Sequence, residues 1–551
     1  MRLLYPKPTP YEPLAWSKLP FGERGRLACE SWALDGYGTP PVIYAVHALK
    51  LVGFAAMWAV WCGFSPGLGG LGSIAQWWTS PIAFEKAIVW AMLFEGLGLG
   101  CGFGPLTGRY FPPVGGALYF LRPGTTKLPV FPRLPLLGGA TRTWLDVALY
   151  AAVVASTVRI LVAPAPGVAH FLPLALLVPL VGLADRTIFL ALRAEHYWTV
   201  VCCFVATEHW LGGAKAVQLA LWLWAGISKL NHHFPTTVCV MTSNSPVARL
   251  PWLRRLLYRA HPGDVRPSRF ATWLAHAGTA LELSVAIVLA FAPAGPWMFV
   301  GIGLALVLHS FITSSVPMGV PIEWNLVAVY SVFALFWAHP EVSVLDVGIT
   351  PLAALLVVML VLVPLVGNLV PARVSFLLSM RYYAGNWPYS VWLFRGESYR
   401  KLAQLKTSAP WIYDQLDRFY DRPTSVGLVG KVLAFRLMHL QGRALPQLVA
   451  KAVDRIEEYE YLDGEIVAGL VLGWNFGDGH LHNEQLLGNI QQQCGFEPGE
   501  LRCVFVEAQP MGGKTMAWRI CDASTGPMAA GELDVATMRL HQPWETGPSG
   551  P

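Results

Sequence analysis

Charged residues are scarce in this chain of 551 residues. Asp, Glu, Lys and Arg together make up 13% of it, and hydrophobic residues make up 54%, whereas ordinary soluble domains carry about 25% charged residues. The mean hydropathy is +0.45. This composition excludes an ordinary soluble domain and predicts a polytopic membrane protein.

Several common signatures are also missing. The N-terminal stretch MRLLYPKPTPYEPLAWSKLP lacks the features of a signal peptide, so we expect the first transmembrane segment to direct targeting. The nine cysteines form no CxxC pair, which predicts neither a disulfide framework nor a metal cluster. The absence of GxxxxGK[ST], HExxH and GxSxG motifs excludes the commonest ATPases, zinc proteases and hydrolases. We recognise no nucleic-acid-binding module.

Long apolar runs dominate the first two thirds of the chain. A helix needs roughly 20 apolar residues to cross a bilayer, and the best segments are 42–63, 84–104, 145–163, 170–192, 271–293, 297–316, 321–338 and 348–370. Two shorter runs, 196–211 and 214–229, predict a hairpin that turns at Gly212-Gly213. The expected fold is an all-α polytopic membrane bundle of about 9–10 helices.

Basic residues predict how the bundle is oriented. They are concentrated in the segment before the first helix, in the 105–143 loop and in the 230–270 loop. With ten helices these segments fall on one face, and the positive-inside rule makes that face cytoplasmic. We therefore expect a bacterial-type inner or plasma membrane protein with both termini in the cytoplasm.

From about residue 373 the composition changes to mixed charge. RALPQLVAKAVDRIEEYEYL is typical of a helix, and RCVFVEAQP and TMAWRICDAS are typical of strands. The predicted domains are an N-terminal cytoplasmic segment (1–41), a transmembrane domain (42–372), a soluble α+β domain (373–545) and a disordered tail (546–551). Asp478, His480 and His482 could contact a metal or a head group, but a structural loop that caps a helix is favoured.

Ionisable residues inside apolar segments are functional candidates, because each costs about 2.5–3.5 kcal/mol to insert. The candidates are His47, Lys50, Glu95, Arg159, Asp185, Arg186, Glu208, Lys229, His276, Glu282, His309 and Glu323. For Asp185, Arg186 and Arg159 we favour a structural pair or a side chain that reaches the interface.

Two pairs are predicted to meet at equal depth. His196 and Lys229 lie about 16 residues on either side of the Gly212-Gly213 turn. Glu282 and His309 are likewise matched in the next hairpin, which turns near 293–296. An imidazole beside an amine or a carboxylate can transfer protons when it is withdrawn from water. The alternative for Lys229 is a side chain that extends to the membrane surface.

These residues resemble the transmembrane core of the vitamin K-dependent gamma-carboxylases, also called the horizontally transferred transmembrane domain. In LWLWAGISKLNHHF the family's aromatic-x-x-Ala-Gly-x-x-Lys-Leu pattern is matched, and its basic lysine corresponds to Lys229. AEHYWTVVCCF is similar to the segment that carries the family's catalytic histidine, here His196. The resemblance covers about residues 180–395.

Further segments extend the resemblance. WLAHAGTALELSVAIVL is similar to a family helix with a histidine and then an acid, here His276 and Glu282. LVLHSFITSSVPMGVPIEWNL is similar to the helix with an internal histidine, here His309. NWPYSVWLF is similar to a segment near the family's substrate site, which corresponds to Tyr389.

The resemblance implies a chemistry. Lys229 would deprotonate a reduced lipoquinone of the vitamin K or menaquinol type, which with O₂ gives a strong base. That base abstracts a proton from an acceptor that then takes up CO₂, assisted by the histidines. Trp222, Trp224 and His276 would contact the cofactor ring, although tryptophans also serve as interfacial anchors.

Two functions therefore compete. A quinol-dependent, carboxylase-like enzyme requires Lys229 and His196 to share a pocket open to the bilayer. A non-catalytic transporter or lipid- or quinone-binding protein requires a salt-bridged Lys229 and a polar path through Glu95, Glu208, Glu282 and Glu323. The expected partners are membrane lipids and a lipophilic small molecule, and a homo-oligomer is left open.

Overall fold

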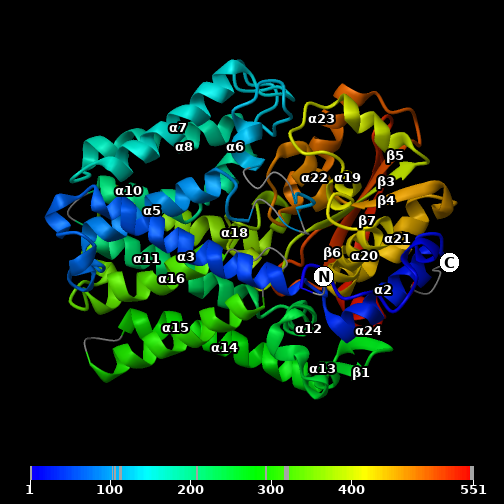
Figure 1. The fold of residues 1–551 in the computed structure, drawn as a ribbon, viewed down its shortest axis with the longest axis horizontal. Coiled ribbons are helices and arrows are strands. Elements are labelled where there is room, and N and C mark those ends of the chain that lie inside the picture. The colour runs from blue at the N-terminus through cyan, green and yellow to red at the C-terminus, as the bar shows by residue number, and fades with distance from the viewer. Residues whose placement is uncertain are drawn as a thin grey trace.

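The computed structural model describes residues 3–101, 104, 107–110, 115–206, 209–291, 295–315 and 322–546. A bundle of apolar helices forms one half of the molecule, and a five-stranded sheet with its own helices forms the other (Figure 1). This arrangement confirms the predicted class, a helical membrane bundle followed by an α+β region. We call residues 373–546 the C-terminal region.

Five helical stretches in the described part of the chain are long and apolar enough to cross a membrane. They are α3 (Pro41–Gly63), α7 (Trp144–Val162), α14 (Arg269–Phe291), α15 (Pro296–Ser314) and the stretch Pro351–Leu369. The last consists of α17 (Pro351–Val357), a π-helical segment (Val358–Leu362) and α18 (Val363–Leu369). Shorter helices complete the bundle: α5 (Pro81–Gly96), α8 (Val168–Ala184), α10 (Tyr197–Val205), α11 (Trp210–Ser228) and α16 (Ile322–Ser331).

One predicted helix is broken by a buried acid. The segment predicted over 170–192 divides into α8 and α9 (Arg186–Ala191), with Asp185 between them. Asp185 accepts a hydrogen bond of 2.5 Å from Arg142 Nη2, and both side chains are fully buried. A buried carboxylate must be paired, so the helix breaks at Asp185, where the side chain reaches Arg142 in the loop before α7. This confirms the structural role favoured for Asp185.

The predicted turn at Gly212-Gly213 is wrong. Both glycines lie inside α11, and the connection from α10 precedes Trp210. A Cβ atom would lie 2.8 Å from the carbonyl oxygen of Ser343 at Gly212, and 2.7 Å from Cys203 Sγ at Gly213. The glycines therefore allow neighbouring segments to approach closely, as small residues do in membrane bundles.

The C-terminal region contains an antiparallel sheet of order β4-β3-β5-β6-β7. Its strands are β3 (Tyr389–Arg395), β4 (Tyr459–Asp463), β5 (Leu501–Val506), β6 (Thr515–Asp522) and β7 (Gly526–Asp534). The two predicted strands are confirmed as β5 and β6. The long helix predicted over residues 443–462 is wrong beyond Ala452, where α21 (Leu445–Ala452) ends, because EYEYL pairs with β3 instead.

The remaining helices and strands belong to these two halves or connect them. They are α1 (Pro13–Trp16), α2 (Phe21–Asp35), α4 (Ile74–Trp77), α6 (Gly115–Phe120), α12 (Phe234–Asn244), α13 (Pro251–Leu257), β1 (Tyr258–Ala260), β2 (Asp264–Pro267), α19 (Ile412–Leu416), α20 (Arg422–Met438), α22 (Gly464–Leu472), α23 (Glu484–Cys494) and α24 (Val535–Leu540).

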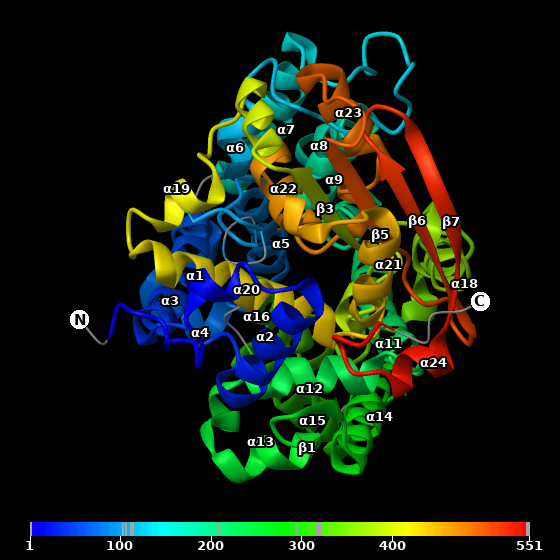
Figure 2. The same ribbon diagram turned by 90° about the vertical axis from the view of Figure 1, so that its right-hand side faces the viewer.

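The N-terminal segment packs on the C-terminal region (Figure 2). Lys431 of α20 donates hydrogen bonds of 3.1 and 3.0 Å to the carbonyl oxygens of Ser31 and Gly36. The rings of Trp32 and Phe435 have centroids 5.7 Å apart. Helix α2 is thus part of the packed core beside α20.

The three basic segments all contact the C-terminal side of the molecule. Arg122 donates to the carbonyl oxygen of Thr407 at 2.8 Å, and Arg266 donates to that of Leu540 at 2.8 Å. Tyr420 donates to the carbonyl oxygen of Leu4 at 3.3 Å. The basic segments and the C-terminal region therefore lie on the same side of the bundle.

This arrangement sets the expected result of a topology test. A green fluorescent protein fused after residue 551 should fluoresce in bacterial cells, and alkaline phosphatase at the same position should be inactive, because the positive-inside rule places this side in the cytoplasm. Phosphatase inserted in the 164–167 connection should be active. An active C-terminal phosphatase fusion would contradict the predicted orientation.

Candidate ligand-binding site

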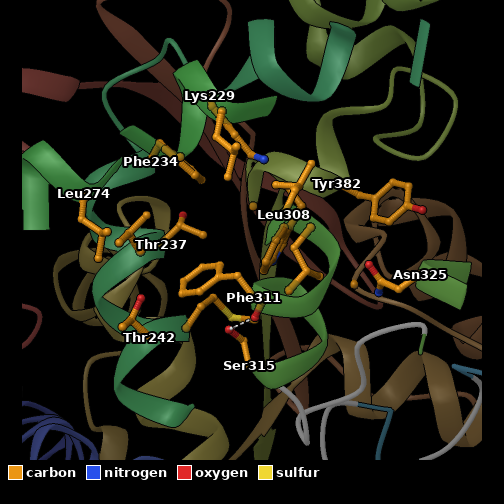
Figure 3. A pocket seen from close by; sticks show the side chains of 18 of the residues that line it. Lys229, Phe234, Thr237, Thr242, Leu274, Leu308, Phe311, Ser315, Asn325 and Tyr382 are labelled. Atoms are coloured by element: carbon orange, nitrogen blue, oxygen red, sulfur yellow. Dashed lines mark hydrogen bonds between the residues drawn. The ribbon is translucent and has the colours of Figure 1, made fainter. Parts of the chain in front are cut away.

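A cavity of about 380 Å³ lies where the bundle meets the C-terminal region (Figure 3). Helices α12, α14 and α15 line its membrane half, and segments 376–387, 435, 465 and 476–477 line its other half. Its wall is largely apolar, and among the residues described it includes one lysine, Lys229, and one carboxylate, Glu465. Binding sites for amphiphiles commonly combine an apolar wall with a few placed polar groups.

The mouth of the cavity faces the membrane. Val307 and Phe311 line the cavity from α15, and they are 60% and 44% exposed on the surface of the bundle. On a helix that crosses a bilayer, exposed apolar side chains contact lipid tails. A lipid-soluble molecule could therefore reach the cavity from the side, past Val307 and Phe311 of α15.

Lys229 reaches the cavity because two helices approach closely. It follows α11 directly and forms a buried salt bridge with Glu282 of α14. At Gly226, one turn earlier, a Cβ atom would lie 2.6 Å from Leu283 Cδ2. Without that Cβ the helices come together, so the amine and the carboxylate meet away from water. In Figure 3 the Lys229 amine points into the cavity, toward the side where Leu308 and Tyr382 lie.

His309 and His196 do not line the cavity but contact residues close to it or in its wall. Trp222 Nε1 donates to His309 Nε2 at 3.0 Å, and His309 Nδ1 lies 2.9 Å from Asn325 Oδ1. Because an indole nitrogen only donates, Nε2 is unprotonated and the imidazole donates from Nδ1. Trp324 Nε1 donates to His196 Nδ1 at 3.3 Å. Trp324 and Asn325 line the cavity, so both histidines orient residues of its wall.

The other predicted site residues have separate surroundings. Trp224 donates to the carbonyl oxygen of Leu360 at 2.7 Å and joins α11 to the π-helical segment. His276 is exposed on α14. Tyr389 is buried in β3, with the guanidinium of Arg436 5.0 Å from its ring centroid.

These four residues pair differently from the prediction, which rested on equal depth in two hairpins. It matched His196 with Lys229, and Glu282 with His309. In the structure Lys229 pairs with Glu282, and each histidine bonds to a tryptophan. The hairpin geometry failed because its turn lies before Trp210, which shifts the register of α11 against α10.

Glu465, the carboxylate that lines the cavity, is not among the site residues predicted from the sequence. Glu465 begins α22, and its carboxylate is paired with Arg436 of α20, which also bonds Asp463 at 2.6 Å. Burial raises the pKa of Glu465 to about 7, and the charge of Arg436 opposes that rise. The only sequence signal was the Asp-Gly-Glu run at a strand end, which is common in turns.

A second group of acids lies deeper in the bundle. Donor atoms of Glu95, Cys101 and Glu323 lie within 4.8 Å of one another, all buried. Two cations adjoin them: Lys50 Nζ is 3.7 Å from Glu323, and Arg193 Nη2 is 3.8 Å from Cys101 Sγ. Of the acids expected to form a polar path, Glu95 and Glu323 converge here, Glu282 lies with Lys229, and Glu208 is outside the described residues.

The histidine-containing loop of the C-terminal region has the structural role we favoured. The Asp478 carboxylate accepts from the backbone N–H of His480 at 3.0 Å, and Asn483 caps α23 by accepting from the N–H of Gln485 at 3.0 Å. His482 Nδ1 lies 2.6 Å from Ser390 Oγ. These contacts anchor the loop to β3 and start the next helix.

A bundle with several candidate membrane spans, a side opening toward lipid and a packed α+β region define an integral membrane protein. The chain belongs to a family of transmembrane proteins of unknown function, DUF3556, which it matches over residues 1–551. No match was found among curated proteins or among solved structures.

The Lys229–Glu282 pair makes a prediction about stability. Glu282→Ala leaves a buried ammonium without its partner, so we expect a loss of about 3–5 kcal/mol in the free energy of unfolding. The double variant Lys229→Met/Glu282→Leu should recover most of that loss, because neither side chain then carries charge. Thermal unfolding in detergent measures both. Additive losses in the double variant would show that the two residues are not coupled.

Proposed function

We propose that this protein takes a lipophilic hydroquinone, of the vitamin K or menaquinol type, from the bilayer into the cavity and uses it in carboxylase-like chemistry. The observation that carries the proposal is the amine of Lys229, held by Glu282 on the wall of a cavity whose mouth faces lipid. The resemblance of the segment around Lys229 to the gamma-carboxylases supports the same assignment.

The residues of the cavity suit such a molecule. The mouth formed by Val307 and Phe311 is apolar, as an isoprenoid chain requires. Aromatic side chains, among them Trp324 and Tyr382, offer stacking surfaces to a planar ring. Lys229 and Glu465 supply polar groups for hydroxyls.

The ion pair explains how Lys229 would act as a base. Transfer of one proton from the ammonium to the Glu282 carboxylate gives a neutral amine beside a neutral acid, a state that burial favours over two charges. A neutral amine in a dry cavity can accept a proton from a nearby hydroxyl. The bound hydroquinone would supply that hydroxyl, and its oxidation by O₂ would drive the addition of CO₂ to an acceptor. His309 and His196 would keep Asn325 and Trp324 in place on the cavity wall.

A second candidate function is quinone or lipid binding without catalysis. The salt bridge of Lys229 favours it, because a lysine held in an ion pair is the arrangement that this alternative requires. The position of His196 behind Trp324 favours it too, since the enzyme hypothesis placed His196 in the same pocket as Lys229.

Turnover of a quinol decides between these functions. The purified protein should convert reduced menaquinone or vitamin K to its epoxide under O₂, and Lys229→Ala should lower the rate by about 10²-fold or more, because it removes the base. The matched control is Lys18→Ala, which removes an exposed lysine far in the sequence from Lys229 and should leave the rate unchanged.

The other results are equally informative. Quinol binding without epoxide, in wild type and variant alike, would support the binding function and reject the enzyme. If the wild-type protein neither binds nor converts the quinol, the enzyme and the quinone-binding function are both rejected.

A further inference from the structure

The far end of the cavity is an aromatic chamber built by the C-terminal region. Its five rings, all of which line the cavity, belong to Phe376, Tyr382, Trp387, Phe435 and Phe476. Their contacts are continuous: centroids are 5.5 Å apart for Phe376 and Tyr382, 6.1 Å for Phe376 and Trp387, 6.0 Å for Tyr382 and Phe476, and 6.3 Å for Trp387 and Phe435. Such a chamber suits a flat aromatic guest.

Glu465 adds a hydrogen-bond acceptor to this chamber. Its Oε1 accepts from the backbone N–H of Gly477 at 2.5 Å, and its Oε2 accepts from Arg436. A carboxylate oxygen has lone pairs for two hydrogen bonds. Gly477 has a φ of 65°, a conformation that favours glycine, and it lies beside both Glu465 Oε1 and the ring of Phe376.

The charges around Glu465 favour a ligand that donates a hydrogen bond to its carboxylate. Arg436 forms salt bridges with both Asp463 and Glu465. When both carboxylates are ionised, these three buried side chains carry one net negative charge. The nearby imidazole of His439 bonds through Nδ1 to the carbonyl oxygen of Phe435 at 2.7 Å, and burial lowers its pKa to about 3, so it stays neutral.

Trp387 adds a donor to the same chamber. Its buried Nε1–H makes no hydrogen bond to any residue that the structure describes. A buried polar group without a partner is uncommon and requires an explanation. A hydroxyl can accept one hydrogen bond while it donates another, so a bound ring could supply the partner that this N–H lacks.

We propose that the aromatic chamber binds the ring of a hydroxyl-bearing aromatic amphiphile, whose O–H donates to Glu465 and accepts from Trp387. Where that amphiphile is a hydroquinone, the inference rests on the proposed function and extends it. The two hydroxyls of a hydroquinone lie on opposite sides of the ring, and Lys229 and Glu465 line the cavity from different halves of the molecule. Glu465 is then a second proton acceptor, and the C-terminal region is part of the site.

A matched pair of simple ligands tests this inference without any quinone. 4-Nonylphenol donates a hydrogen bond, whereas its methyl ether does not. By calorimetry in lipid nanodiscs, the wild-type protein should bind the phenol roughly tenfold more tightly than the ether, the effect of one charge-assisted hydrogen bond. Glu465→Gln should reduce the preference to about threefold or less, and the control Glu532→Gln, on exposed β7, should keep it.

Two further measurements do not depend on how well Glu465→Gln folds. Trp387→Phe keeps the ring but removes the N–H, and it should weaken phenol and ether binding alike, about three- to fivefold, because the oxygen of each ligand can accept that hydrogen bond. In the wild type the preference for the phenol should fall as the pH drops through about 7, because Glu465 becomes protonated there. In Glu465→Gln the preference should not change with pH.

Each outcome separates this inference from the proposed function. Quinol turnover that needs Lys229, together with a phenol preference that Glu465→Gln does not change and phenol binding that Trp387→Phe does not weaken, would contradict the proposed chamber and support the proposed function. A Glu465-dependent phenol preference without quinol binding would keep the chamber and reject the quinol. Tighter, Glu465-dependent binding of decyltrimethylammonium than of the phenol would overturn the inference in favour of a cationic ligand.

Discussion

The pairing of buried charges is the constraint on which the rest of this structure depends. An isolated ion in an apolar bundle is too costly to keep. Lys229 is therefore joined to Glu282, Arg142 to Asp185, and Lys127 to Asp146. Each pair joins segments far apart in the sequence and so sets which segments meet. The Lys229–Glu282 pair also holds an amine on the wall of the cavity.

Hydrogen bonds of buried polar side chains join the bundle to the C-terminal region. The polar residues that follow Lys229 are used for this contact: Asn231 accepts from the backbone N–H of Gly512 at 2.9 Å, and His233 Nε2 donates to the carbonyl oxygen of Ala384 at 2.9 Å. The chain thus ends an apolar helix on a cation and then anchors it to the α+β region. The cavity lies at this junction, so its two halves come from different parts of the chain.

Much of the fold could be predicted, because its signals are local. Of the predicted membrane helices, five are long and apolar enough to cross a membrane in the described part of the chain. The runs RCVFVEAQP and TMAWRICDAS correctly predicted β5 and β6. The failures came where contacts across the chain prevail over local pattern. Asp185 ends a helix to reach Arg142, the glycines at 212 and 213 serve helix packing, and EYEYL becomes a strand because β3 is beside it. Within the site, Lys229 and Glu282 were identified as residues but not as a pair.

The sequence by itself determined that this is a membrane protein, which segments are apolar enough to enter the bilayer, and which ionisable residues lie inside them, because hydropathy and charge belong to each residue. Only the tertiary structure decided which charges pair, where the cavity opens and that Glu465 and the aromatic rings complete it. Those properties depend on the distances between residues separated by up to several hundred positions, for example Lys229 and Glu465, and a single sequence contains no record of such distances.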